Sequence, residues 1–465
     1  MHEAEEQALI QRFEHMLQED VVGFFDVEEF EHIATYYLET GDFTKALKAI
    51  EFGSHQHPYS PSFVVKRAQY AVATDRLDEA EQFLNHAESL DPTNADVHAT
   101  RGLLFSKQGR PEEAIRCLKK AIRTAEDPVG IWIQLGGIYQ SLGRYEEAIK
   151  FFKQVLEEEP SDENTLYNLA ICYDSMDQGH KAVEWFHAFI QKHPYSETAW
   201  YHLGITHSRL RNPEEALKSL DYALLIDDQF TAAYYEKARL LERSERFTEA
   251  AAVYELSLEG DEESGYAHFR LGNCLRMMEQ LEGANEHFRK AIELDPELDE
   301  AHLELALMLS DQGRFFESLH HIKKALALES ENPDYHLVAA DIYKRMGLLQ
   351  EAENRYRTVL YTMQMPDPDL YMDYAELLLD MEQVDLAYNT LLEALLAFPD
   401  SEALHAVYVG YLLSSNDWDE ALAWLERGML LNAAEMGALL LEYFPHLRED
   451  ARLMEKLGPY APPLA

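Results

Sequence analysis

The chain has 465 residues and is 47% hydrophobic, which is enough for a large buried core. Its 85 acidic residues outnumber 40 basic ones, and the resulting net charge of −45 is repelled by nucleic acid backbones and anionic lipids, so neither is an expected partner. We expect no secretory signal, because no cationic stretch precedes an apolar segment, and no membrane span, because no run of about 18 apolar residues occurs.

Residues 1–26 are predicted to form an N-terminal capping helix and a linker. Leu9, Phe13, Met16 and Leu17 recur at the spacing of one helical face, and Val21 and Val22 follow them. We expect this apolar face to cover the open flank of the segment that begins at Val27.

A 34-residue period begins at Val27 and continues through most of the chain. Ten units fill residues 27–366, Asp367 is one extra residue, and two further units fill residues 368–435. Because Pro366, Asp367 and Pro368 interrupt the phase, we expect a local change of path there. Residues 436–465 are predicted to form C-terminal capping helices and a tail. The units begin at Val27, Pro61, Ala95, Val129, Glu163, Glu197, Thr231, Gly265, Asp299, Pro333, Pro368 and Glu402.

Small residues recur at two positions of each unit. Position 20 is alanine in eleven of the twelve units and serine in the other, and position 8 is alanine or glycine in all but one. Such a pattern indicates two helices per unit that cross closely, since a leucine at either position would overpack the crossing by about 1–3 kcal/mol. Glycine at position 15 indicates a turn with positive φ in the units with Gly41, Gly109, Gly143, Gly313 and Gly347.

This 34-residue pattern closely resembles the tetratricopeptide repeat. The resemblance implies an all-α fold: a right-handed α-solenoid superhelix of about twelve helix-turn-helix repeats, closed by the two caps. It also implies that the first helix of each repeat lines a concave groove, which in this family mostly binds peptides or protein segments. In that geometry, positions 2, 5, 6, 9, 12 and 13 of the first helix face the groove.

Aromatic rings occupy position 5 in four successive repeats: Tyr167, Tyr201, Tyr235 and Phe269. Stacked repeats would turn this spacing into a ladder of rings, which offers large contact area at low entropic cost. Asn168 and Asn273 could form hydrogen bonds with the backbone of a bound segment. The alternative is that these rings only pack, since tyrosine is common at this position throughout the family.

Arginine is enriched at the groove positions of repeats 6 to 8. Five arginines against Glu236 and Glu242 give a local charge of five minus two, or +3, in a chain of −45. Guanidinium groups bind carboxylates through paired hydrogen bonds, so repeats 5–8 are predicted to bind an extended segment with acidic and apolar side chains. The alternative is ion pairing within the groove, of Glu236 with Arg239 or Arg270. The five arginines are Arg209, Arg239, Arg243, Arg270 and Arg276.

No pattern in the chain indicates catalysis, a cofactor or a metal. The histidines at position 4, such as His98 and His302, are interpreted as packing residues, and Cys117, Cys172 and Cys274 as inert core residues in a reducing, cytoplasmic compartment. We therefore predict a non-enzymatic scaffold that binds a protein or peptide in its groove. The alternative is a structural subunit that self-associates or stays within a larger assembly.

Overall fold

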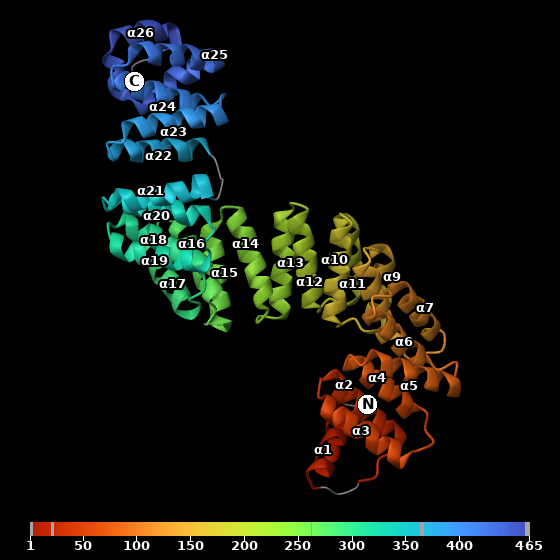
Figure 1. Ribbon diagram of the computed structural model, residues 1–465. Helices are drawn as coiled ribbons and strands as arrows, with labels where there is room; N and C mark the ends of the chain where they lie inside the picture. The colour runs from red at the N-terminus through yellow and green to blue at the C-terminus, as the bar shows by residue number, and fades with distance from the viewer. Residues whose placement is uncertain (1–2, 20–22, 262, 363–366, 461–465) are drawn as a thin grey trace. The chain divides into compact units, whose positions relative to one another are not determined.

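The computed structural model describes residues 3–19, 23–261, 263–362 and 367–460, and these residues form helices and turns without a strand. The predicted all-α solenoid is confirmed: after the N-terminal helix, antiparallel helix pairs follow one another along the chain (Figure 1). The chain divides into two compact units, unit 1 (Met1–Leu240) and unit 2 (Leu241–Ala465). The division into segments ending at residues 26, 366 and 435 stays a prediction.

Unit 1 begins with α1 and continues with helix pairs. Its helices are α1 (Glu3–Glu19), α2 (Val27–Glu39), α3 (Phe43–Gln56), α4 (Ser62–Ala73), α5 (Leu77–Leu90), α6 (Ala95–Lys107), α7 (Pro111–Ala121), α8 (Val129–Ser141), α9 (Tyr145–Glu158), α10 (Glu163–Ser175), α11 (Gly179–Lys192), α12 (Glu197–Arg209) and α13 (Pro213–Ile226). The boundary between the units falls within α14 (Thr231–Arg243).

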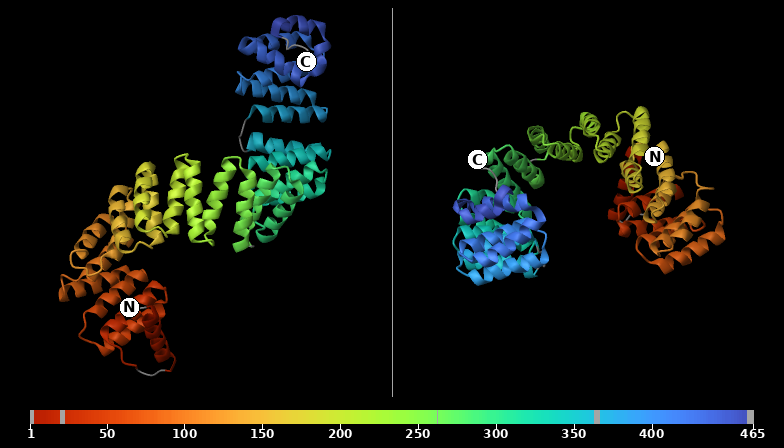
Figure 2. Two further views of the ribbon diagram at one scale, coloured as in Figure 1. Left: turned by 180° about the vertical axis from the view of Figure 1, so that it is seen from behind. Right: turned by 90° about the horizontal axis from the view of Figure 1, so that it is seen from above.

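Unit 2 continues the alternation of first and second helices, and Figure 2 shows its cyan and blue helices as successive layers. Its helices are α15 (Phe247–Gly260), α16 (Gly265–Met277), α17 (Leu281–Leu294), α18 (Asp299–Asp311), α19 (Phe315–Leu328), α20 (Pro333–Arg345), α21 (Leu349–Arg357), α22 (Pro368–Asp380), α23 (Val384–Ala397), α24 (Glu402–Ser414), α25 (Trp418–Tyr443) and α26 (Ala451–Leu457).

Most first helices begin where a polar side chain caps them, whereas α4, α8 and α18 have no side-chain cap. The side chain of Asp26 accepts a hydrogen bond from the backbone N–H of Glu29, and the side chain of Glu29 accepts one from the backbone N–H of Asp26. Asn94, Asp162, Ser196, Asn332, Asp367 and Ser401 cap later first helices in the same way. The capping residue therefore sets the start of these first helices.

The turn inside every repeat has a residue in the left-handed region at position 15. The five predicted glycines have φ between 70° and 79°, which confirms the expected positive φ. The other seven repeats adopt the same conformation, with φ between 53° and 65°, at a residue that carries a side chain. These residues are Asp75, Asp177, Arg211, Glu245, Glu279, Glu382 and Asn416.

The close crossing predicted from small residues is present. A Cβ atom added at Gly136 in α8 would lie 2.4 Å from the ring of Phe152 in α9, which is fully buried. Gly204 likewise leaves no room between its helix and Leu220, and the carbonyl of Ala216 lies 3.3 Å from where its Cβ would be. Positions 8 and 20 therefore meet backbone to backbone, and a large residue at position 24 fills the space beside them.

The segments predicted to act as caps pack their apolar residues against neighbouring helices, and their role as caps stays a prediction. In α1, Leu9, Phe13 and Met16 are buried against residues that include Phe25 and Phe30, whereas Val21 and Val22 lie outside the described residues. At the other end, α25 bends at Asn432, which has non-helical φ and ψ of −154° and 98°. Its second part joins α26 in burying apolar residues, among them Leu440 and Leu453.

The structure describes part of the segment in which the 34-residue period is interrupted. The last turn after α21 is a π-helix, Thr358–Thr362, rather than a continuation of the α-helix. Asp367 is the N-cap of α22, and its carboxylate accepts hydrogen bonds from the N–H groups of Asp369 and Leu370. Pro366 lies outside the described residues, and the change of path expected there stays a prediction.

Candidate peptide-binding surface

In unit 1, two of the predicted rings lie over one buried histidine. Tyr167 in α10 is 55% exposed, and Tyr201 in α12 is partly buried. Their ring centroids lie 5.9 and 5.2 Å from that of His202, and Phe230 lies 5.0 Å from Tyr201. Three rings therefore form one continuous patch, here called the tyrosine patch: Tyr167, Tyr201 and Phe230.

His202 forms the floor of the tyrosine patch. Its side chain is 5% exposed and its ring stacks on Phe186 at 6.1 Å. Burial lowers the pKa of His202 to about 4, and the positive charge of Arg209 adds to this effect. The imidazole is therefore neutral at physiological pH, and the patch above it presents rings rather than a cation.

The predicted polar residues of unit 1 have partners within the chain. Arg239 forms an ion pair with Glu236 at 3.2 Å, and Arg209 forms one with Asp174. Two arginines thus face two carboxylates, which leaves no local excess of positive charge. Asn168 donates a hydrogen bond to the carbonyl of Asn164 at 2.9 Å within its own helix. Tyr235 is partly buried and has interactions of its own.

In unit 2, the expected ring at Phe269 does not offer a binding surface. The side chain is 7% exposed, and its ring centroid lies 6.1 Å from that of Phe288 in α17. The expectation of an exposed ring here is wrong, because Phe269 packs on the helix of its own repeat. Asn273 is also turned partly inward: its Oδ1 is buried and makes no hydrogen bond to the residues described.

The arginines of unit 2 are largely neutralised as well. Arg270 forms an ion pair with Glu242, and Arg276 lies 3.0 Å from Glu304. Although burial opposes its charge, the hydrogen bonds and attraction from Glu242 raise the pKa of Arg270. Arg243 is exposed and has no ion-pair partner among the residues described. Three arginines against two carboxylates leave +1, so pairing within the chain explains most of the predicted cationic surface.

An apolar cavity on the first helices of unit 2 was missed from the sequence. Its volume is about 250 Å³, and it lies between α18 and α20, lined by Leu307, Ser310, Asp311, Leu337, Val338, Asp341, Ile342 and Arg345. Leu307, Leu337 and Val338 occupy positions 9, 5 and 6, which the resemblance already assigned to the groove. The repeat position therefore predicts that these apolar side chains lie on the groove face, although it does not predict the cavity between them.

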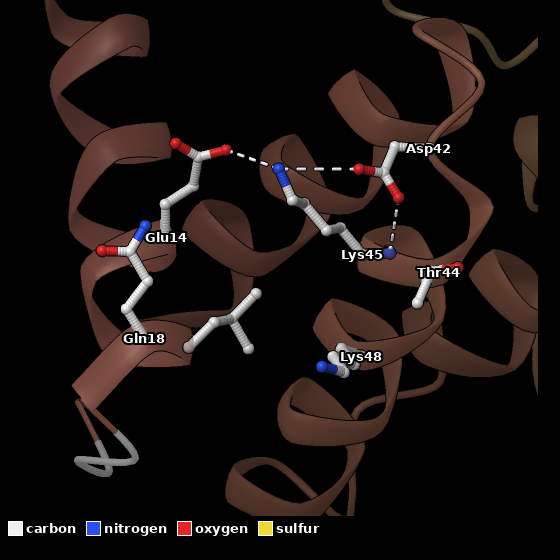
Figure 3. A pocket seen from close by; sticks show the side chains of 7 residues that line it. Glu14, Gln18, Asp42, Thr44, Lys45 and Lys48 are labelled. Atoms are coloured by element: carbon white, nitrogen blue, oxygen red, sulfur yellow. Dashed lines mark hydrogen bonds and ion pairs between the residues drawn. The ribbon is translucent and has the colours of Figure 1, made fainter.

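A second cavity lies where α1 meets α3 (Figure 3). Its volume is about 440 Å³, and Lys45 crosses it between Glu14, at 2.7 Å, and Asp42, at 3.5 Å. The hydrogen bond from Lys45 lowers the pKa of Glu14. Because its main charges pair with one another, this cavity is best understood as the joint between the cap and the first repeat.

The histidines at position 4 pack as expected. The Nε2 atoms of His98, His336 and His405 donate to the carbonyl six residues earlier, at 3.0–3.1 Å, and Trp200 makes the same bond through Nε1. Burial raises the pKa of the Cys172 thiol to about 11, and burial with the charge of Glu242 raises that of Cys274 to about 12. Neither thiol is activated as a nucleophile.

Two features are missing from the part of the chain that the structure describes. No group of three or more His, Cys, Asp or Glu side chains there has the geometry to hold a metal ion. None of the described helices is both long and apolar enough to cross a membrane.

Comparison with known proteins places the repeats in a family. Tetratricopeptide repeat models match residues 33–95, 105–163, 201–264 and 265–298, and a model of the N-terminal tetratricopeptide region of psidin matches residues 137–215. No curated protein sequence matches the chain.

Among solved structures, YrrB, described as a tetratricopeptide repeat protein with an unusual peptide-binding site, is 23% identical; the match covers 40% of this chain and 96% of that one, with a TM-score of 0.35. MamA from Desulfovibrio magneticus RS-1 is 22% identical over 37% of this chain and 96% of that chain, with a TM-score of 0.33. The Cut9–Hcn1 complex of the APC/C is 14% identical over 87% and 93%, with a TM-score of 0.39. The family models and the helical repeats together show that the chain belongs to the tetratricopeptide repeat proteins.

Proposed function

We propose that this protein is a non-enzymatic scaffold that binds an extended segment of another protein along its first helices. The observation that carries the proposal is the tyrosine patch, because Tyr167 on α10 is 55% exposed beside Tyr201 and Phe230. Tyrosine rings on rigid helices supply contact area at low entropic cost, which suits recognition of a peptide. Tetratricopeptide repeat proteins mostly bind peptides or protein segments in their groove, which supports the same function.

The ion pairs alter the predicted chemistry of the bound segment in unit 1. An acidic segment would have to displace Glu236 from Arg239 and Asp174 from Arg209, and each exchange replaces one ion pair with another. The tyrosine patch therefore supports an apolar or aromatic contact more directly than a carboxylate contact.

Replacing the exposed ring tests the proposal. We expect Tyr167→Ala, combined with Tyr201→Ala, to weaken partner capture at least about tenfold, because truncating an aromatic hot spot of an interface costs about 2 kcal/mol or more. Tyr195→Ala is the matched control, since Tyr195 is 82% exposed in a turn of the same unit. Affinity purification with mass spectrometry would identify partners, and titration with an identified partner would give the change. Equal capture by all three proteins would exclude the tyrosine patch as the binding surface.

A second candidate function is self-assembly. Tyr361, Leu396 and Leu430 occupy the same repeat position in the last three repeats and are 44%, 86% and 87% exposed. An aligned row of exposed apolar side chains can mark an interface. Light scattering at rising protein concentration tests this: a mass that stays monomeric in wild type, or oligomers that persist in Leu396→Ser/Leu430→Ser, would exclude this interface.

A further inference from the structure

The cavity between α18 and α20 can accept an apolar side chain from outside. Leu307 is 38% exposed, and Leu337 and Val338 are partly buried beside it. The volume of about 250 Å³ exceeds the roughly 150 Å³ of a dry cavity that binds benzene. Unlike the cavity beside α1, this one has an apolar floor, so occupancy by an aliphatic side chain would remove apolar surface from water.

The side chains around this cavity carry a net negative charge. Arg345 is shared between Asp341, at 2.9 Å, and Asp311, at 3.4 Å. Lys344, also in α20, is shared between two carboxylates of the next first helix, α22: Glu376, at 2.7 Å, and Asp380, at 3.9 Å. Two cations therefore serve four carboxylates, and the four side chains are between 50% and 78% exposed.

A fifth carboxylate adds to this excess. Burial and the repulsion from Glu376 raise the pKa of Asp373 in α22, and Asp369 and Asp341 contribute to that repulsion. Counting Asp373 with the four paired carboxylates, these five acids against Lys344 and Arg345 give a local charge of −3.

Charge complementarity decides among possible occupants. A second copy of this chain carries −45 and is repelled, as is a nucleic acid. A peptide with basic residues on either side of an aliphatic one satisfies both features, because its cations would meet the shared carboxylates while its apolar side chain fills the cavity.

We propose that the first helices α18, α20 and α22 bind an extended basic segment that inserts one aliphatic side chain into the cavity at Leu307, Leu337 and Val338. This deepens the proposed scaffold function and rests on it, since it assigns a partner chemistry to the same face of the repeats.

Fluorescence anisotropy with the full chain and synthetic peptides tests the inference. The probe is a labelled peptide with leucine between pairs of lysines, compared with the same peptide carrying alanine, and with one in which glutamate replaces lysine. We expect the alanine peptide to bind about tenfold more weakly, the loss expected when an aliphatic side chain no longer fills an apolar site. The glutamate peptide should not bind, and binding of the leucine peptide should weaken as salt rises.

Paired charge variants locate the binding surface. Asp311→Asn with Glu376→Gln should weaken binding of the leucine peptide severalfold, because both side chains are exposed on the proposed surface. Glu351→Gln with Asp385→Asn changes the same charge on exposed positions of the second helices α21 and α23 and should leave binding unchanged. Leu307→Ser should abolish the preference for leucine over alanine.

Three results would overturn the inference: no preference for leucine, equal weakening by both charge pairs, or a preference that survives in Leu307→Ser. If these appear while the tyrosine variants still lose their partner, the scaffold function stands and only the assignment to α18, α20 and α22 fails. If the peptide binds as expected while the tyrosine variants capture partners normally, the tyrosine patch fails and this surface stands.

Discussion

Gly136 and Gly137 are neighbours in α8 with opposite surroundings, which makes them a sensitive test of the crossing. A Cβ at Gly136 would lie 2.4 Å from the buried ring of Phe152, whereas a Cβ at Gly137 meets nothing within 4 Å. We expect Gly136→Ala to destabilise by about 1–3 kcal/mol through overpacking. Gly137→Ala should stabilise by about 0.5–1 kcal/mol, because alanine is the better helix former. Thermal unfolding of both variants would check the signs, and stabilisation by both would mean that the crossing is looser than described.

His202 should make unit 1 sensitive to acid. Its folded-state pKa of about 4 lies below the ordinary 6.5, so between these values the unfolded chain binds a proton that the folded chain does not. The stability that the neutral ring contributes is therefore present above pH 6.5 and is lost as pH falls toward 4, by up to about 3 kcal/mol. Denaturant unfolding at pH 7.5 and 5.0 should show a larger loss for wild type than for His202→Gln.

The control for this pH effect is His55→Gln, because His55 is exposed on α3 of the same unit. We expect that variant to follow the wild-type pH dependence. If His202→Gln also follows the wild-type curve, the acid sensitivity comes from other groups, such as His207, whose pKa burial also lowers, and not from this ring.

At the scale of single elements, the turn position offers a route to stabilisation in the seven repeats that lack glycine there. Glu279 has φ of 60°, which costs a residue with a side chain about 1–2 kcal/mol relative to the right-handed region. After allowing for the greater freedom of glycine in the unfolded chain, we expect Glu279→Gly to stabilise by about 0.5–1 kcal/mol. Gly143→Ala should destabilise by about 1 kcal/mol, and since its new Cβ meets nothing within 4 Å, the effect isolates the backbone term. Unfolding midpoints that move in the same direction for both variants would contradict this account.

The helix pairs were predictable because their causes repeat with the period. Small residues at the crossing and apolar faces recur through the twelve repeats, and glycine marks the turn in five of them, so a single exception such as Val409 does not hide the period. The π-helix at Thr358–Thr362 and the bend at Asn432 each occur once in the described chain. No feature that recurs with the 34-residue period predicts them.

The candidate site was harder to predict because each charged or aromatic side chain has several ion-pair or packing partners within reach. Arg270 could reach Glu236 or Glu242, and only the packing of the helices brings it to Glu242. Phe269 and Tyr167 share position 5, yet one packs on Phe288 and the other stays exposed. Repeat position therefore predicts which face a residue is on, whereas exposure and pairing depend on its neighbours in space.

For the whole molecule, the repeat architecture limits how far the destabilisation caused by one substitution extends along the chain. Each repeat buries its apolar residues against itself and the repeats before and after it, so stability should approximate a sum of local and neighbour terms. Phe152→Ala removes a ring that is 1% exposed, and we expect a loss of about 3–5 kcal/mol. Hydrogen exchange should lose protection in α7 to α10, while α2 to α5 of unit 1 and α20 to α24 of unit 2 keep theirs.

Phe288→Ala is the mirror experiment, because Phe288 occupies the same repeat position in unit 2 and is fully buried. Its loss of protection should centre on α16 to α19 and leave α2 to α9 unchanged, since none of those helices shares a repeat or a neighbouring repeat with it. The two variants should thus show complementary exchange patterns of similar depth. If either variant instead lowers protection evenly from α2 to α24, the chain unfolds as one cooperative body, and sums over neighbouring repeats do not describe its stability.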